Sequence, residues 1–298
     1  MKRRQFLKQS GLAALTMSLP MSQLFAVDKA VKILYFERSS DFVHAPTIDL
    51  GKGESVAGRA LRRMGRENGF EVDCTKEGTI FDGDLDQYAA FVFYTCGELE
   101  QPGGRFPSSV MSKEGIRRFY HAIREKGKGF LGIHSAVDTW KTPGDRLQNQ
   151  PIEERTEYIK MIGGQFYQHG HQQEVTLSVI DPTLPWISKQ GKSFRFLDEW
   201  YSMKNFAPDL HVILAQETDG MDKEGVNSCY DRPRFPSTWA RKEGKGRIGY
   251  TAVGHNNESW DAEVVPGLVT DLIGFVTGRY DLDLTPNLTE SCPGAAIL

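Results

Sequence analysis

The stretch Lys128-Gly129-Phe130-Leu131-Gly132-Ile133-His134 indicates the fold more clearly than any other part of the chain. It is a continuous apolar run without polar alternation, which is typical of a strand buried on both faces of a parallel sheet. A helical pattern over residues 112–126 precedes it, with Ser112 placed to cap the helix and Gly127 placed to end it. This order of a helix followed by a buried strand predicts one unit of a layered α/β protein.

The same alternation extends toward the start of the chain. Continuous β-branched and aromatic runs predict further strands, and an apolar stripe at helical spacing predicts a helix between two of them. The expected strands are residues 31–36, 71–75 and 89–95, and the expected helix is residues 55–68. Together these segments predict a parallel sheet with helices on both faces.

The second half of the chain is less regular. Helices are expected at residues 154–162 and 264–277, and strands at 173–180, 210–216 and 248–253. Residues 238–241 are expected to pair with 248–251 as a hairpin across the turn Gly244-Lys245-Gly246. The Pro- and Gly-containing tail after Asp281 is expected to be loosely packed.

Four of the seven histidines follow strand-like runs: His44, His134, His169 and His255. In open α/β sheets, ligands bind outside the carboxyl ends of the strands, so these imidazoles are expected at one site. Imidazole binds metals and exchanges protons near neutral pH, which predicts a metal site or an acid–base site. The other three are interpreted as structural, incidental or exposed: His121, His171 and His211.

The start of the chain has the pattern of an export signal. Residues 1–26 contain a twin-arginine pair, Arg3-Arg4, followed by a short apolar run. This pattern predicts a periplasmic or secreted protein with a main domain over 27–281 and a tail over 282–298. The alternative interpretation is a basic N-terminal helix of a cytosolic protein.

Composition excludes several classes of protein. The formal net charge is −3 and no long basic run is present, which argues against a nucleic-acid partner. No later segment has 18 consecutive apolar residues, so no permanent membrane anchor is expected. The four cysteines are too widely spaced for a zinc ribbon, although a disulfide such as Cys229–Cys292 is allowed in an oxidising compartment. The sequence does not determine the oligomeric state.

Several motifs resemble those of the ThuA-like (trehalose utilisation) family. The resemblance extends over residues 31–279, and its motifs are 130–139 (FLGIHSAVDT), 163–169 (GGQFYQH), 198–201 (DEWY) and the segment 239–255 that ends in Gly254-His255. It implies a flavodoxin-like fold of the class I glutamine amidotransferase type, with an elaborated second half. Amidotransferases of that class keep a nucleophilic cysteine where this chain has His134, so thiol-dependent glutamine hydrolysis is not expected.

Cys96 and Ser135 are the alternative candidates for a nucleophile. Cys96 follows a strand but would need a neighbouring histidine as its base. Ser135 lies in Gly132-Ile133-His134-Ser135-Ala136, which differs from the Gly-x-Ser-x-Gly elbow of serine hydrolases. Both are therefore alternatives to histidine and carboxylate chemistry.

Glu199 is the leading carboxylate candidate, because partial burial beside Trp200 and Tyr201 could raise its pKa to a value useful for a general acid or base. Asp198 could orient a histidine. The aromatic side chains of Trp200, Tyr201, Trp140 and Trp260 could form a platform for a sugar, or they could belong to the core.

The resemblance implies a carbohydrate substrate, in particular a glycoside oxidised at its 3-hydroxyl group. We therefore predict proton transfer by Glu199, His44 and His134, and substrate binding by Trp200, Tyr201 and Asp138. This chemistry is expected to operate with or without a divalent metal; such a metal, with zinc as the first choice, would be held by His134, His169 and His255. The alternatives are a non-catalytic carbohydrate-binding protein or accessory of a sugar oxidoreductase, and an amidotransferase or hydrolase that uses Cys96.

Overall fold

A nine-stranded sheet forms the centre of the protein, in the order β2-β1-β3-β4-β11-β10-β9-β6-β7. The computed structural model describes residues 31–224 and 229–296. Its first five strands are parallel, and their order is that of flavodoxin-like sheets. They are β2 (Phe70–Thr75), β1 (Val31–Phe36), β3 (Ala90–Phe93), β4 (Gly129–Ile133) and β11 (Gly246–Thr251). The flavodoxin-like α/β fold expected from the sequence is confirmed.

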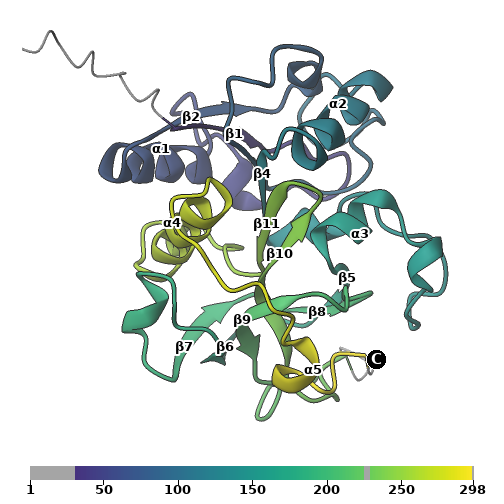
Figure 1. The fold of residues 1–298 in the computed structure, drawn as a ribbon, viewed down its shortest axis with the longest axis vertical. Coiled ribbons are helices and arrows are strands. Elements are labelled where there is room, and N and C mark those ends of the chain that lie inside the picture. Colours follow the sequence, from purple (N-terminus) through teal and green to yellow (C-terminus); the bar gives the residue numbers. More distant parts are fainter. Residues whose placement is uncertain (1–30, 225–228, 297–298) are drawn as a thin grey trace, which may run out of the picture.

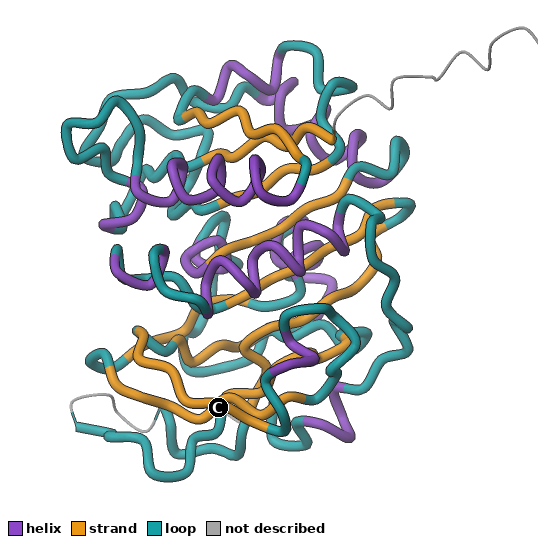
Figure 2. Tube along the Cα trace, turned by 90° about the vertical axis from the view of Figure 1, so that its left-hand side faces the viewer, coloured by secondary structure: helices purple, strands orange, loops and turns teal. Residues whose placement is uncertain are grey.

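Helices cover both faces of the parallel strands. α1 (Val56–Asn68) and α4 (Val264–Val276) pack on one face, and α2 (Lys113–Arg124) and α3 (Glu157–Ile162) pack on the other. Figure 1 shows the two pairs to the left and right of the sheet, and Figure 2 shows the first pair in front of the strands. Because helices shield both faces, β3 and β4 are buried throughout, which explains their unbroken apolar sequence.

Local sequence signals define the helix ends. The Ser55 side chain accepts a hydrogen bond from the backbone N–H of Gly58, and Ser112 does the same for Gly115, so each serine caps a helix as expected. α1 ends at Gly69, which has φ of +77°. Glycine adopts this left-handed conformation without the strain that a side chain would cause, so Gly69 ends the helix at little cost in free energy.

The second half of the chain extends the sheet in antiparallel fashion with β10 (Phe235–Glu243), β9 (His211–Gln216), β6 (Gln173–Val179) and β7 (Ser193–Asp198). The expected hairpin is present, with Thr238 opposite Thr251 and Arg241 opposite Ile248. This extension is the elaborated second half. Strand β7 was not expected, because its residues alternate between exposed and partly buried without a long apolar run.

A separate two-stranded sheet, also absent from the sequence-based expectation, joins β5 (Gln165–His169) to β8 (Tyr201–Lys204). Their pairing shifts register between Phe166 and Gln168, so Tyr167 is an extra residue in β5. Such a bulge changes the direction in which the following side chains point. It therefore affects His169, at the end of the strand.

The C-terminal tail is packed, which corrects the expectation of a loose one. Helix α5 (Leu288–Ser291) lies against β9, and Cys292 and Ala295 are buried with Val212 and Ala215. Asn287 accepts a hydrogen bond from the backbone N–H of Val212 (2.6 Å) and donates one to its carbonyl (3.1 Å). The tail thus satisfies the backbone hydrogen-bonding groups of Val212, in the part of β9 that β6 does not cover.

All four cysteines are free thiols, so the considered Cys229–Cys292 disulfide is not formed. Cys292 instead packs with Val212 and Ala295 in the cluster on β9, while Cys229 belongs to the main core. The predicted export signal at 1–26 lies outside the described residues and stays a prediction. Within those residues, no helix combines the length and the apolar character that crossing a bilayer requires.

Replacing Asn287 with alanine should lower the free energy of unfolding by about 1–3 kcal/mol, because a backbone N–H and a carbonyl of β9 lose their partner. Urea denaturation measures this effect. Glu290→Ala, an exposed change in the same segment, is the control and should be nearly neutral. Equal stability of the two variants would show that the tail contributes little.

Candidate active site

Four segments meet at the carboxyl edge of the parallel strands. The loop after β1 carries His44, His134 directly follows β4, the loop after β11 carries His255, and the junction between β7 and β8 carries Glu199. Ligand atoms of these four residues all lie within 4.8 Å of one another. Three of the four imidazoles that follow strands in the sequence therefore converge, together with the expected carboxylate.

His134 is held in a strained conformation. Its φ is +45°, in the left-handed region that only a few per cent of residues other than glycine occupy, although histidine is found there more often than most. It begins the short helix η3 (His134–Asp138) directly after β4 and is fully buried. Strain of this kind costs on the order of 1–3 kcal/mol and persists where the surroundings enforce it, commonly at functional sites. The turn thus directs the imidazole of His134 to the carboxyl edge of the parallel strands.

Hydrogen bonding fixes the tautomer of His134. Its Nδ1 lies 2.7 Å from the backbone carbonyl of Ala252, and a carbonyl can only accept. Nδ1 therefore carries the hydrogen, and in the neutral ring Nε2 presents a lone pair. The ring also packs against Tyr201, with centroids 4.2 Å apart. Both contacts orient Nε2 toward His255 and Glu199.

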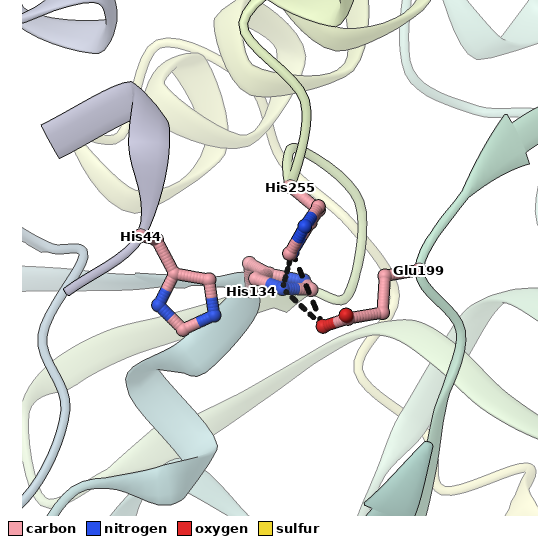
Figure 3. A group of neighbouring side chains, drawn as sticks. All are labelled: His44, His134, Glu199 and His255. Atoms are coloured by element: carbon pink, nitrogen blue, oxygen red, sulfur yellow. Dashed lines mark hydrogen bonds and ion pairs between the residues drawn. The ribbon is translucent and has the colours of Figure 1, made fainter. Parts of the chain in front are cut away.

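Three donor atoms form a compact triangle (Figure 3). His134 Nε2 lies 3.2 Å from His255 Nδ1 and 3.5 Å from Glu199 Oε2, and His255 Nδ1 lies 3.1 Å from the same carboxylate oxygen. The side chains of His134, Glu199 and His255 are 0%, 11% and 16% exposed, so the triangle opens to solvent on the side of His255.

The pKa of Glu199 is shifted in the opposite direction from that expected. Burial alone would raise it, but the N–H groups and positive charges that His134 and His255 present to the carboxylate when their rings are protonated hold the pKa well below its ordinary value. The carboxylate is therefore ionised throughout the physiological range. The sequence revealed the flanking aromatic residues but not the two imidazoles, which is why the expectation was wrong.

His44 is a buried donor with one nitrogen that is unpaired within the described part of the chain. Its Nε2 lies 3.1 Å from the hydroxyl group of Tyr201, while its buried Nδ1 has no hydrogen-bond partner among the described residues. Burial and the neighbouring His134 and His255 lower the pKa of His44 to about 2. The ring is therefore neutral near pH 7, and an unpaired polar atom in this position is poised for a ligand.

A buried carboxylate positions His255. Asp198 is fully buried, and its oxygens accept hydrogen bonds from the backbone N–H groups of Gly254 (2.7 Å), His255 (3.1 Å) and Glu199 (2.8 Å). Gly254 has φ of +118°, which strains any residue with a side chain. Asp198 was expected to orient a histidine ring; it holds the histidine through the backbone instead.

His169 lies at the rim of this cluster rather than within it. Its Nδ1 is 3.3 Å from Glu199 Oε1 and 2.9 Å from the carbonyl of Gly170, and its side chain is 39% exposed. The predicted ligand set of His134, His169 and His255 is therefore only partly brought together. The bulge at Tyr167 places the His169 ring near Phe166 and Tyr201, a consequence that sequence spacing does not reveal.

The expected aromatic platform is mostly core. Trp200 and Trp260 are fully buried, and their indole N–H groups donate to the carbonyls of Gln173 and Gly254, so neither ring can receive a sugar. Trp140 is 7% exposed, and Tyr201 bonds to His44. The exposed aromatic at the rim is Phe42, 60% exposed and with its ring centroid 4.8 Å from that of His44. Its place two residues before His44 was the signal that was missed.

Asp138 and Cys96 form a neighbouring pair outside the triangle. The thiol of Cys96 donates to Asp138 (3.2 Å), and burial raises the pKa of this thiol well above its ordinary value. The other oxygen of Asp138 is 2.7 Å from Lys141 Nζ. A carboxylate rather than an imidazole is the partner of Cys96, so the thiolate that nucleophilic catalysis requires is disfavoured. Ser135 is fully buried, and its hydroxyl has no partner among the described residues.

The remaining histidines lie apart from the cluster. His211 begins β9 and lies 2.7 Å from Asp181, and His171 is exposed and lies 3.5 Å from Asp222. His121 is in the last turn of α2. These positions agree with their interpretation as structural, incidental or exposed residues.

The fold and the site define an α/β protein of the flavodoxin-like type with a histidine–carboxylate cluster at the carboxyl edge of its parallel strands. The profile of the ThuA family, described as trehalose utilisation, matches residues 32–273, and the chain belongs to this family. The family description links the protein to carbohydrate metabolism. Comparison with curated proteins found no match.

Solved structures share the fold at low sequence identity. A ThuA-like protein from Bacteroides uniformis is 18% identical, with a TM-score of 0.59 over 83% of this chain and 91% of that one. A ThuA-like protein from Parabacteroides merdae is 16% identical, with a TM-score of 0.59 over 85% and 92% of the two chains. A cytoplasmic protein from Salmonella typhimurium is 11% identical, with a TM-score of 0.52 over 83% and 99%.

The lowered pKa of His44 predicts a specific pH dependence of stability in metal-free protein. The pKa of His44 is about 2 in the folded protein, and that of an unfolded histidine is about 6.5. Between these two pH values the unfolded chain binds one more proton than the native chain. Stability should therefore fall with falling pH by up to about 1.4 kcal/mol per pH unit from this residue.

Urea unfolding from pH 7 to pH 4 should show that His44→Gln lacks this component of the loss. His171→Gln, an exposed control, should follow the wild-type curve. Parallel curves for wild type and His44→Gln would contradict the burial of a neutral imidazole.

Proposed function

We propose that this protein is an enzyme that processes carbohydrate at the cluster of His44, His134, Glu199 and His255, with a divalent metal held there. The observation that carries the proposal is the triangle of donor atoms with edges of 3.1, 3.2 and 3.5 Å. Ligands about 2.0–2.1 Å from a tetrahedral zinc ion are separated by about 3.3 Å, so this triangle has the size of one face of a zinc site.

The chemistry of the donor set also fits a metal. His134 presents Nε2 as a lone pair because its Nδ1 donates to Ala252, which is the usual arrangement of a metal-bound histidine. Glu199 is ionised and His44 is neutral, the states in which these groups bind metal. His44 offers a fourth donor to the metal or to the substrate, because one of its ring nitrogens lies within 4.8 Å of the other three ligand atoms and Figure 3 shows its Nε2 on the side of the triangle.

These contacts reassign two predicted roles. Glu199, expected to move protons, is better suited as a ligand, because a carboxylate with so low a pKa is a weak base. His169, expected to be a ligand, is better suited to move protons. Its Nδ1 is engaged by a carbonyl, its side chain is 39% exposed, and it contacts the cluster through Glu199.

The proposed substrate is a glycoside carrying a ketone at C3, a class that the family's link to trehalose utilisation supports. The ketone acidifies the hydrogen on C2. Removal of that proton by a base and loss of the glycosidic oxygen from C1, with a proton from an acid, leave a double bond between C1 and C2. Addition of water across this bond then completes a net hydrolysis.

Residues of this chain would divide these tasks. A divalent metal in the cluster would supply a Lewis acid that polarises the ketone. His169 would accept the proton from C2 and return a proton to the leaving oxygen. Phe42, exposed beside His44, would stack on the face of the sugar ring, and the buried wall of His134 and Tyr201 would exclude water from one side.

Action outside the cytoplasmic membrane belongs to the same proposal. It is supported by the twin-arginine pair Arg3-Arg4 in the predicted signal. Cell fractionation with and without the two arginines would test it. A non-catalytic carbohydrate-binding or accessory role remains the second candidate, and Phe42, a rim aromatic, is the observation that favours it.

Purified protein reconstituted with zinc should contain about one metal ion per chain. His134→Gln should weaken zinc binding by more than about 100-fold, because it removes a ligand whose orientation the protein already fixes. Metal analysis and competition with a chromogenic chelator measure this effect. His171→Gln is the matched control and should bind zinc normally; a wild-type protein that takes up no metal would refute the metal site.

A screen of glycosides and their 3-keto forms should detect cleavage of the keto forms alone. His169→Gln should lower kcat by about 10²–10⁴-fold, the usual contribution of a positioned acid or base, while zinc content is retained. Phe42→Ala should raise KM with less effect on kcat. Binding of the glycosides without turnover of any keto form would favour the non-catalytic alternative.

A further inference from the structure

A second hollow lies beside the cluster and has a volume of about 480 Å³, within the range of small-molecule sites. Its wall is strongly basic. The residues on which the argument depends are Lys141, Arg146, Gln165, Phe166 and Lys204. We call this hollow the basic groove.

Lys204 places a buried positive charge in the basic groove. Its side chain is nearly inaccessible, with the residue 2% exposed, and its Nζ donates to the carbonyls of Asp145 (2.7 Å) and Gln148 (2.9 Å). An ammonium group has three N–H donors, so one remains after these two bonds. Within the described residues no carboxylate forms an ion pair with Lys204.

Arg146 adds a second uncompensated charge. Its Nε donates to the carbonyl of Tyr167 (3.0 Å), whereas its terminal nitrogens have no acceptor among the described residues. Burial lowers the pKa of Lys204; Asp145 opposes this shift, and Arg146 and Arg155 add to it. Lys141, by contrast, is paired with Asp138 at 2.7 Å. Asp145 acts on Lys204 from a distance, but within the described residues neither Lys204 nor Arg146 forms an ion pair, and two such cations create a potential that favours an anion.

The basic groove and the histidine–carboxylate cluster share structural elements. Phe166 lines the groove, and its ring centroid is 4.5 Å from that of Tyr201, which bonds to His44. β5 runs from Gln165 in the groove to His169 at the cluster, a span of roughly 13 Å for an extended strand. One extended ligand could therefore contact both sites.

We propose that the basic groove binds the anionic group of an acidic carbohydrate, so that the substrate of the neighbouring cluster is a glycoside bearing a carboxylate or a phosphate. Arg146 contributes its two terminal nitrogens and Lys204 its third N–H donor. The planar guanidinium suits bidentate contact with either anion. This inference rests on the proposed function only where it calls the ligand a substrate. Binding of the anion in the basic groove does not require turnover.

Titration calorimetry at low ionic strength with glucose, glucuronate and glucose 6-phosphate tests the proposal. At least one of the two anions should bind about tenfold or more tightly than glucose, and 0.5 M NaCl should remove most of the difference. A preference for glucuronate would identify the anion as a carboxylate, and a preference for the phosphate ester would identify it as a phosphate. Equal binding of all three ligands would overturn the proposal.

Arg146→Gln should reduce the affinity for the preferred anion by about fivefold to tenfold and leave glucose unaffected. Arg66→Gln changes the net charge equally from an exposed position on α1 and should have no effect. An equal loss in both variants would overturn the proposal. Lys141→Gln provides a second variant if Arg146→Gln unfolds. Because the charge of Lys141 is already paired with Asp138, this change should reduce the affinity for the anion by a smaller factor.

His134→Gln separates the two hypotheses. It removes a proposed metal ligand and should abolish turnover while preserving the preference for the anion. Loss of turnover with preserved preference would leave the groove established whatever the fate of the metal site. Loss of the preference in His134→Gln would place the anion at the cluster and refute the groove.

Discussion

The buried carboxylate of Asp198 is the contact on which the site depends. It accepts backbone N–H groups from Gly254 and His255 at the end of the parallel half, although it belongs to β7 in the antiparallel extension. Removing it would leave three buried N–H groups unpaired, a cost of about 1–3 kcal/mol for each. Because it ties the two halves together, Glu199 of one half faces His134 and His255 of the other.

Electrostatics within the cluster follow from this convergence. The imidazoles of His134 and His255 favour the ionised form of the Glu199 carboxylate, while burial keeps His44 neutral. The protonation states of Glu199 and His44 are therefore set by the neighbouring side chains and by burial rather than by solvent. An ionised carboxylate and a neutral imidazole are also the protonation states in which these groups would bind the divalent metal that we propose.

Strand β5 links the histidine–carboxylate cluster to the basic groove through its two ends. His169 at one end touches Glu199, and Gln165 at the other end lines the basic groove. The bulge at Tyr167 allows both to occur on a strand of five residues, because it changes the facing of the residues that follow. Asp138 also lies between the cluster and the basic groove. It ends η3, the helix that His134 begins, and it forms an ion pair with Lys141 of the groove.

The sequence by itself determined the parallel α/β core, the serine-capped helices, the hairpin of β10 and β11, and the positions of His44, His134 and His255 at strand ends. These features depend on local periodicity, capping and burial, which neighbouring residues encode. Only the tertiary structure decided that Glu199 is a low-pKa partner of two imidazoles, that Trp200 is core, that the tail is packed and that His169 lies at the rim. Contacts such as the one between His134 and His255, 121 residues apart, determine those properties, and no local pattern records them.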